Sequence, residues 1–229
     1  MKIATIITAG GMGKRVGGNT KKQFLEIEGR PLLFRTIDNF VNIPHISKII
    51  ITLPTDEINI FESKIINEYP ESDIRIVAGG KERQDSVFNA LTACDNNTDF
   101  VLIHDGVRPF ISELEITKIL NLVKIKDAVL PVSAMKNTIK KIEDNKVVTT
   151  IPRENLVNAL TPQAFKYKII LQCHEKAKKS EMQFTDDTAI LEHYGFPVHI
   201  IYTSEMNFKI TNVDDLKMAE MMIKNGVHY

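Results

Sequence analysis

The chain has 229 residues, of which 43% are hydrophobic and 25% charged, and its 29 Lys and Arg residues balance its 29 Asp and Glu residues. This is the composition of an ordinary globular protein with a sizeable core. A net charge of zero excludes a protein that coats nucleic acid or anionic membrane through a general basic excess, so neither partner is expected. Any cluster of positive charge is therefore interpreted as a local site.

Cys94 and Cys173 are the only cysteines, and they lie far apart in the chain. The first strand-like segment begins at residue 3, which leaves no room for a charged leader, and no long apolar segment follows. These features predict free thiols in a reducing compartment, and hence a cytoplasmic protein.

Strand-like and helix-like segments alternate along the first half of the chain, and the strands are nearly continuous apolar runs. In chain order we expect a strand at 3–7, a helix at 32–40, a strand at 48–53, a helix at 58–69, a strand at 73–78, a helix at 84–93, a strand at 100–104, a helix at 113–123 and a strand at 128–132. This pattern predicts an α/β fold with a doubly wound, mostly parallel sheet and helices on both faces. Ligands of such sheets bind beyond the carboxyl ends of the strands.

The pattern changes after residue 131. Two alternating segments, 137–142 and 147–151, flank the turn-forming pair Asp144-Asn145 and predict a β-hairpin arm at about 137–151. Such an arm either reaches a second subunit or folds back on its own sheet. The remaining expected elements are helices at 167–177, 187–193 and 214–223 and a strand at 197–202. Because repeats and flexible linkers are absent from the sequence, we expect one domain over residues 1–229 with this one excursion.

A glycine-rich loop follows the first strand, and cationic side chains lie within it and just after it. The glycines are Gly10, Gly11 and Gly13, and the cations are Lys14, Arg15 and Lys22. Glycines let backbone N–H groups approach phosphate oxygens closely, and the cations balance the charge of a polyphosphate. The P-loop pattern fails at Thr8 and Arg15, and the dinucleotide pattern fails at Val16. The alternative is a glycine-rich turn with solvated charges, but the combination favours phosphate binding.

Two further strand ends carry polar motifs. Gly79-Gly80 precedes Ser86, which either satisfies backbone donors in the first turn of the next helix or contacts a nucleobase or phosphate. Asp105 and Gly106 follow the strand at 100–104. Asp105 is placed either to face a Mg²⁺–triphosphate or to pair with Arg108, and the sequence does not favour one over the other.

The complete set of motifs resembles the cytidylyltransferase family that makes 4-diphosphocytidyl-2-C-methyl-D-erythritol in the non-mevalonate isoprenoid pathway. The matching stretches occur in family order: Ala9-Gly10-Gly11-Met12-Gly13-Lys14-Arg15, Lys22-Gln23-Phe24, Gly79-Gly80 through Arg83 with Asp85-Ser86-Val87, His104-Asp105 with Arg108-Pro109, Asn137-Thr138-Ile139-Lys140, Arg153, Thr161-Pro162-Gln163-Ala164-Phe165, Thr185-Asp186-Asp187 and Asn207-Phe208-Lys209-Ile210-Thr211. They cover almost the whole chain.

The resemblance implies transfer of cytidylyl from CTP to 2-C-methyl-D-erythritol 4-phosphate, with Mg²⁺ present and pyrophosphate released, by a homodimer whose hairpin arms reach between subunits. It implies four catalytic cations, Arg15 and Lys22 at the α-phosphate and Arg153 and Lys209 at the acceptor phosphate. The implied CTP site consists of Ala9, Gly10, Gly11, Gly13, Gly80, Arg83, Ser86, Asp105 and Gly106, with Asp105 also near Mg²⁺. Arg108, Thr138, Thr161 and Thr185 are implied on the acceptor side.

Three positions depart from the family pattern: Lys21 and Asn137 stand where proline and aspartate are usual, and Thr203 where glycine is frequent. Two other functions stay open from the sequence. One is the sister activity that cytidylylates ribitol 5-phosphate, because it shares the glycine loop and the cation positions. The other is a non-catalytic nucleotide-binding regulator, because a fold alone does not establish activity.

Overall fold

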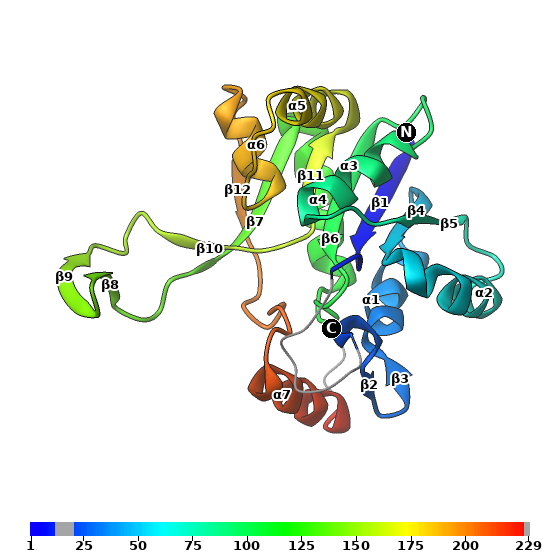
Figure 1. Ribbon diagram of the computed structural model, residues 1–229, viewed down its shortest axis with the longest axis horizontal. Coiled ribbons are helices and arrows are strands. Elements are labelled where there is room, and N and C mark those ends of the chain that lie inside the picture. Colours follow the sequence, from blue (N-terminus) through cyan, green and yellow to red (C-terminus); the bar gives the residue numbers. More distant parts are fainter. Residues whose placement is uncertain (12–20, 227–229) are drawn as a thin grey trace.

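In the computed structural model, residues 1–11 and 21–226 are described, with the side chain of Lys22 left out. Within these residues, the main sheet is eight-stranded, with the order β10-β7-β11-β6-β1-β4-β5 and with β12 paired to β7. The strands are β1 (Ile3–Thr8), β4 (Ile46–Leu53), β5 (Ile74–Ala78), β6 (Phe100–Asp105), β7 (Ala128–Ala134), β10 (Val157–Ala159), β11 (Gln163–Lys166) and β12 (His199–Tyr202). Figure 1 shows this sheet as the body of the molecule.

Most pairings in the sheet are parallel, as the alternating pattern predicts. β1 lies parallel to β4 and β6, β4 to β5, and β12 to β7. The exceptions are β11, which lies antiparallel between β6 and β7, and β10, which is antiparallel to β7. Both are short and were not expected from the sequence. β11 forms through antiparallel pairing with β6 and β7, which lie far away in the chain.

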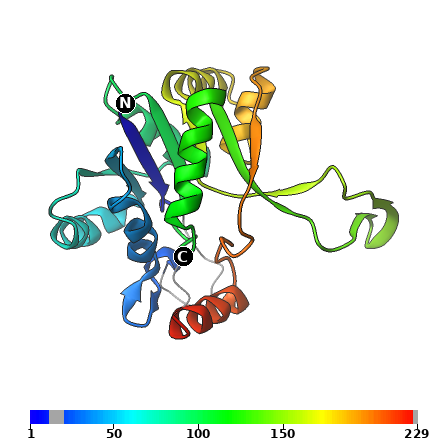
Figure 2. The same ribbon diagram turned by 180° about the vertical axis from the view of Figure 1, so that it is seen from behind.

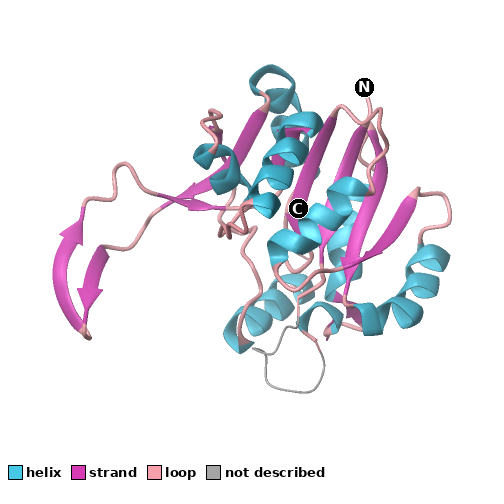
Figure 3. Cartoon of the chain, turned by 45° about the horizontal axis from the view of Figure 1, so that its top comes forward, coloured by secondary structure: helices cyan, strands magenta, loops and turns pink. Residues whose placement is uncertain are grey.

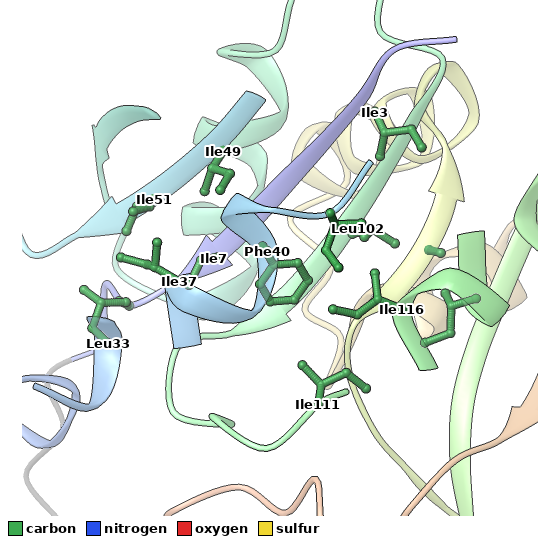
Figure 4. Packing of buried hydrophobic residues seen from close by; sticks show 14 of the residues in the cluster. Ile3, Ile7, Leu33, Ile37, Phe40, Ile49, Ile51, Leu102, Ile111 and Ile116 are labelled. Atoms are coloured by element: carbon green, nitrogen blue, oxygen red, sulfur yellow. The ribbon is translucent and has the colours of Figure 1, made fainter. Parts of the chain in front are cut away.

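The central strands are mostly apolar, and both faces of the sheet are covered. Ile3 and Ile7 of β1 belong to one core cluster, and Ala4 and Ile6 to another, as the alternation of side chains along a strand requires. The first cluster includes α1 (Leu32–Val41) and α4 (Glu113–Lys126), and Phe40 of α1 is fully buried in it (Figure 4). The second includes α3 (Arg83–Thr92), α5 (Tyr167–Lys179) and α6 (Asp187–His193). Figure 3 shows the helices on both faces.

The remaining elements of the body are η1 (Lys22–Phe24), β2 (Glu26–Ile27), β3 (Arg30–Pro31), η2 (Thr55–Glu57), α2 (Ile58–Glu68) and α7 (Val213–Lys224). β2 and α7 lie beside the end of β6, at the carboxyl edge of the sheet. A third cluster joins α7 to this edge through Ile27, Val107, Ile210 and Met222. This packing holds the segment just before α7, which contains Lys209, against the end of β6. No described helix is long and apolar enough to cross a membrane.

The hairpin arm projects from the body instead of folding back on the sheet (Figures 1 and 2). Its strands, β8 (Ile139–Glu143) and β9 (Lys146–Ile151), form a two-stranded sheet of their own. Asp144 and Asn145 connect them with φ of 46° and 62°, the left-handed pair that a two-residue type I′ turn requires. Ile142 and Val147 are 61% and 63% exposed, so the described part of the chain leaves these apolar side chains of the arm largely uncovered.

Candidate active site

The register of the parallel strands brings the ends of β1, β4 and β6 to one edge. Thr8 aligns with Thr52 on one side and with Asp105 on the other. The chain leaving β1 is tied to both neighbours, because Ala9 N donates to Thr52 O at 3.0 Å and Gly106 N donates to Thr8 O at 2.9 Å. The glycine loop and the Asp105-Gly106 turn therefore start side by side.

Gln23 fixes the beginning of the glycine loop. It is 2% exposed, and its Nε2 donates to Ala9 O at 2.7 Å and to Gly11 O at 3.1 Å. These two hydrogen bonds fix the orientation of the Ala9 and Gly11 carbonyls, and hence the backbone conformation at the start of the loop. Lys21, where proline is usual in the family, instead pairs with Asp56 at 2.7 Å and with Glu57 at 3.1 Å. This departure is thus accommodated by an ion pair with η2.

The second glycine pair lies against the first. A Cβ built on Gly10 would lie 3.1 Å from the Ser86 Oγ, and one on Gly79 would lie 3.2 Å from it. Ser86 Oγ accepts from Gly80 N at 2.9 Å and donates to Glu82 O at 3.1 Å. The hydroxyl thus bonds backbone groups just before α3 rather than donors of its first turn, and it also lies at the junction of the two loops.

Asp105 is the centre of a cluster of positive side chains. Its Oδ1 accepts from Arg83 Nε at 3.2 Å, and its Oδ2 accepts from Arg108 Nε at 3.2 Å and from Lys209 Nζ at 3.1 Å. Burial alone would raise the pKa of Asp105, but the charges of Arg83, Lys209 and Arg108 hold it well below its usual range. Asp105 is therefore an anion that gathers three cations from three separate elements.

Thr161 and His104 form a hydrogen-bonded network that fixes the backbone of Asp105. Thr161 Oγ1 accepts from Asp105 N at 3.2 Å and lies 3.0 Å from His104 Nδ1, while His104 Nε2 lies 2.9 Å from Arg108 O. A carbonyl accepts only, so Nε2 of His104 carries the proton and Thr161 donates to Nδ1. Burial lowers the pKa of His104 to about 4, which keeps the ring neutral. His104 is thus a structural residue, and among the described residues it belongs to no group of three or more His, Cys, Asp and Glu side chains that could hold a metal.

Asn207 connects Thr161 with the segment that carries Lys209. Its Nδ2 donates to Thr161 O at 2.7 Å, and its own carbonyl accepts from Arg108 Nη1 at 2.9 Å. Asn207 is fully buried. Because these bonds join the ends of β6, β11 and the segment before α7, Lys209 is held within reach of Asp105.

The structure brings together only part of the expected site. Arg83, Asp105, Arg108, Thr161 and Lys209 form one cluster, with the two glycine loops beside it. Thr185 is exposed just before α6, and Thr138 is exposed just before β8. Gly13 and Arg15 lie outside the described residues, and for Lys22 only the backbone position in η1 is described.

Arg153 lies at the base of the arm rather than in the Asp105 cluster. It is exposed, and its guanidinium donates to the carbonyl of Lys136, whose ammonium pairs with Glu205. Its contacts within the described part of this chain therefore hold it beside the arm. If Arg153 binds a phosphate, the contacts around Asp105 do not show where that phosphate lies.

Comparison with known proteins identifies the family. The sequence profile of the 2-C-methyl-D-erythritol 4-phosphate cytidylyltransferases (IspD) matches residues 3–225. The chain belongs to this family. Proteins of this name from Clostridium beijerinckii and from Clostridium perfringens strain SM101 are 40% and 41% identical to it, over 98% and 97% of this chain and 100% and 99% of their own.

Solved structures of the family share the fold. The 4-diphosphocytidyl-2C-methyl-D-erythritol synthase of Anaerococcus prevotii DSM 20548 has a TM-score of 0.87 and 34% identity, over 97% of this chain and 96% of its own. The 2-C-methyl-D-erythritol 4-phosphate cytidylyltransferase of Thermus thermophilus has a TM-score of 0.82 and 27% identity, over 98% and 100%. The fold predicted from the sequence is thereby confirmed.

Several residues that organise the site were not singled out from the sequence. Gln23, Gln163, Asp187 and Asn207 were quoted only as parts of motifs, and His174 not at all. All are buried polar side chains. A buried polar group needs a partner, but the sequence does not reveal which residues of the fold will be buried together.

Proposed function

We propose that this chain transfers the cytidylyl group of CTP to 2-C-methyl-D-erythritol 4-phosphate and releases pyrophosphate. Membership of the family over residues 3–225 is the observation that supports this, and it favours this acceptor over ribitol 5-phosphate and an enzyme over a non-catalytic regulator. The cations of the Asp105 cluster can bind phosphate groups, which such an activity needs.

The reaction joins two anions. A phosphate oxygen of the acceptor attacks the α-phosphorus of CTP, a new P–O bond forms, and the bond to the β-phosphate oxygen breaks as pyrophosphate leaves with the electron pair. The attacking oxygen is already ionised, so neither a general base nor a covalent nucleophile is required. Catalysis then rests on positioning and on stabilisation of negative charge.

The cations divide this work. We assign Arg15 and Lys22 to the charge that develops at the α-phosphate, and Lys209 and Arg153 to the acceptor phosphate, with Arg108, Thr138, Thr161 and Thr185 on the acceptor side. The backbone of the two glycine loops, from Ala9 to Gly13 and at Gly80, would hold CTP together with Ser86 and Gly106. Lys209 supports this assignment, because its side chain is 36% exposed and already paired with a carboxylate at the carboxyl edge.

Mg²⁺ would neutralise the triphosphate charge when bound. Among the described residues there is no group of three or more His, Cys, Asp and Glu side chains that could hold a metal. Both oxygens of Asp105 accept from cationic side chains, so a metal at this carboxylate would be opposed by three positive charges. The side chains described do not fit a preformed metal site. We propose that Mg²⁺ enters with CTP on phosphate oxygens, which it prefers, and the metal role of Asp105 stays a prediction.

We also propose a cytoplasmic homodimer in which the arm of one subunit reaches the site of the other. The arm exposes Ile142 and Val147, and apolar side chains of this kind are suited to burial against a second copy. Arg153 at its base would then be delivered to the partner's acceptor site. The buried free thiols of Cys94 and Cys173 agree with a reducing compartment.

Pyrophosphate release tests the proposed activity. The purified chain is incubated with CTP and Mg²⁺ and with either 2-C-methyl-D-erythritol 4-phosphate or ribitol 5-phosphate. We expect kcat/KM at least about 100-fold higher for the methylerythritol phosphate, since a few mismatched hydrogen bonds suffice for such discrimination. Equal rates with the two acceptors, or no release with either, would contradict the proposal.

A further inference from the structure

A buried carboxylate lies behind the site, outside the residues assigned to substrates. Asp187 is the first residue of α6 and is 1% exposed. Its Oδ1 accepts from His174 Nε2 at 3.1 Å, and its Oδ2 accepts from Arg83 Nη1 at 2.8 Å. Gln163 Oε1 accepts from the backbone N of Asp187 at 3.2 Å, which fixes the main chain at this point. Each carboxylate oxygen thus has a partner, and the backbone of the residue is held separately.

Arg83 bridges this carboxylate to Asp105. The same guanidinium that donates through Nη1 to Asp187 donates through Nε to Asp105 Oδ1 at 3.2 Å. The planar fork of arginine fixes the directions of these two bonds relative to each other. Arg83 is therefore confined to the Oδ1 side of Asp105, and Oδ2 is left to Arg108 and Lys209.

The charges make this arrangement sensitive to Asp187. Two carboxylates, Asp105 and Asp187, face the three cations Arg83, Arg108 and Lys209, which leaves a net charge of 3 − 2 = +1. Without the charge of Asp187, Arg83 would be attracted to Asp105 alone. It would then compete with Arg108 and Lys209 for the same carboxylate.

We infer that Asp187 is a positioning residue that acts through Arg83 on the acceptor-side cations. By holding Arg83 on one side of Asp105, it sets where Lys209 and Arg108 lie, although it contacts neither. The inference rests on the proposed function, in which Lys209 binds the acceptor phosphate. It assigns a role to a buried ion pair that would otherwise be considered only as part of the core.

Steady-state kinetics of Asp187→Asn test this role. The variant keeps the shape of the side chain and removes its charge. We expect KM for the acceptor to rise about ten-fold, because Lys209 and Arg108 are displaced, and KM for CTP to rise by a smaller factor, because Arg83 and Asp105 also belong to the implied CTP site. Thr188→Val is the matched control, since Thr188 is buried in the same helix and bonds Asp186 rather than Arg83. It should lower stability without moving either KM.

A double-mutant cycle tests whether Arg83 carries the effect. If Asp187 acts through Arg83, Asp187→Asn should add less than about two-fold to the acceptor KM in an Arg83→Gln background. Full additivity of the two effects would contradict the inference. So would an acceptor KM of Asp187→Asn equal to that of the parent protein.

Lysine acetylation gives a readout that does not need activity. The acetylation rate of Lys209 by a small acylating reagent is followed by mass spectrometry, with Lys48 as internal control, because Lys48 pairs with Asp95 at 2.9 Å away from this cluster. In Asp187→Asn we expect Lys209 to react about three-fold faster and Lys48 at its original rate. Equal acceleration of both lysines would indicate general loosening, and no acceleration would overturn the inference.

These outcomes separate the two proposals. If the parent protein failed to use the acceptor, the proposed function would fail, while Lys209 acetylation would still decide the role of Asp187. Where Asp187→Asn does not fold, Arg83→Lys serves instead, because an ammonium group lacks the fork that bridges both carboxylates. It should accelerate Lys209 acetylation in the same way, and an unchanged rate would overturn the inference.

Discussion

Gly10 and Gly79 approach each other so closely that a Cβ on Gly79 would lie 3.0 Å from the Cα of Gly10. The first residue follows β1 and the second follows β5, and β4 lies between these two strands. The two glycine loops recognised in the sequence are therefore one structural unit. Side chains at these positions would push apart the backbones that we propose to hold CTP.

Among the described glycines, Gly80 is the one for which substitution should cost most. A Cβ at this position would lie 2.2 Å from Asp85 Cβ and 3.0 Å from its carbonyl carbon. The backbone would have to shift, so we expect Gly80→Ala to lower the free energy of unfolding by about 2 kcal/mol and to weaken CTP binding. Urea unfolding and calorimetric titration with CTP measure both.

Gly11→Ala is the matched control for stability, because no described atom lies within 4 Å of a Cβ built on Gly11. We expect its unfolding free energy to stay within about 0.5 kcal/mol of the parent. A destabilisation of Gly11→Ala as large as that of Gly80→Ala would show that the contact with Asp85 is not the cause.

Arg15→Ala and Lys22→Ala should reduce kcat by about 100-fold or more, because each removes a cation from the charge that develops at the α-phosphate. Pyrophosphate release measures kcat, and circular dichroism checks that the fold is kept. Near-normal turnover in either variant would exclude the charge-stabilising role of that residue.

Mixing Arg153→Ala and Lys209→Ala subunits should restore part of the activity that each variant loses. We expect Arg153→Ala to raise mainly the KM for the acceptor and Lys209→Ala to lower kcat/KM for it. When the two variants are mixed and allowed to exchange subunits, each mixed dimer has one site with both substitutions and one intact site. At low acceptor concentration, the mixture should recover about a quarter of the parent rate.

The absence of any recovery, with subunit exchange verified by mass spectrometry, would mean that the arm does not deliver Arg153 to the other subunit. If the two variants carry different affinity tags, the mixed dimer can be purified, and its rate can be measured without the two parent variants present.

His104 should make the protein less stable in mild acid. Its pKa is lowered to about 4 in the folded state by burial, whereas an unfolded histidine titrates near ~6.5. The unfolded state therefore binds the additional proton between these values, and stability is lost as the pH falls through that window. The full loss is on the order of 3 kcal/mol.

Urea unfolding at several pH values between 7 and 4 measures this loss, and the NMR titration of the His104 ring assigns it. The carboxylates Asp105 and Asp187 have lowered pKa values and should contribute only at lower pH. A His104 ring that titrates near ~6.5 in the folded protein would contradict the prediction.

The sequence predicted the main elements well because their signals are local. The apolar runs of β1, β4 and β6 and the periodicity of α1 determine structure over a few turns or strand residues. The arm was also predicted, with its turn at Asp144-Asn145. By contrast, β11 was missed, because its position between β6 and β7 depends on antiparallel pairing with residues far away in the chain.

The site was predictable only where it consists of contiguous motifs. The glycine loops stand out because their residue types suit phosphate, whereas Lys209 was implied only by the family resemblance. For Asp105, pairing with Arg108 was one of the two alternatives. That Arg83 bridges Asp105 and Asp187 could not be predicted, since sequence spacing does not define which buried charges meet. The roles of Arg15, Lys22 and Arg153 stay predictions.

The sequence by itself determined the class of chemistry, because glycines at strand ends and a set of cations in family order already describe a phosphate-binding enzyme. Only the tertiary structure decided which charges act together. Parallel register places the ends of β1 and β6 at one edge, and the packing of α3, α6 and the segment before α7 brings Arg83, Asp187 and Lys209 to Asp105. The strength of an electrostatic interaction depends on the distance between the charges and on their burial, and the order of residues in the chain gives neither of these.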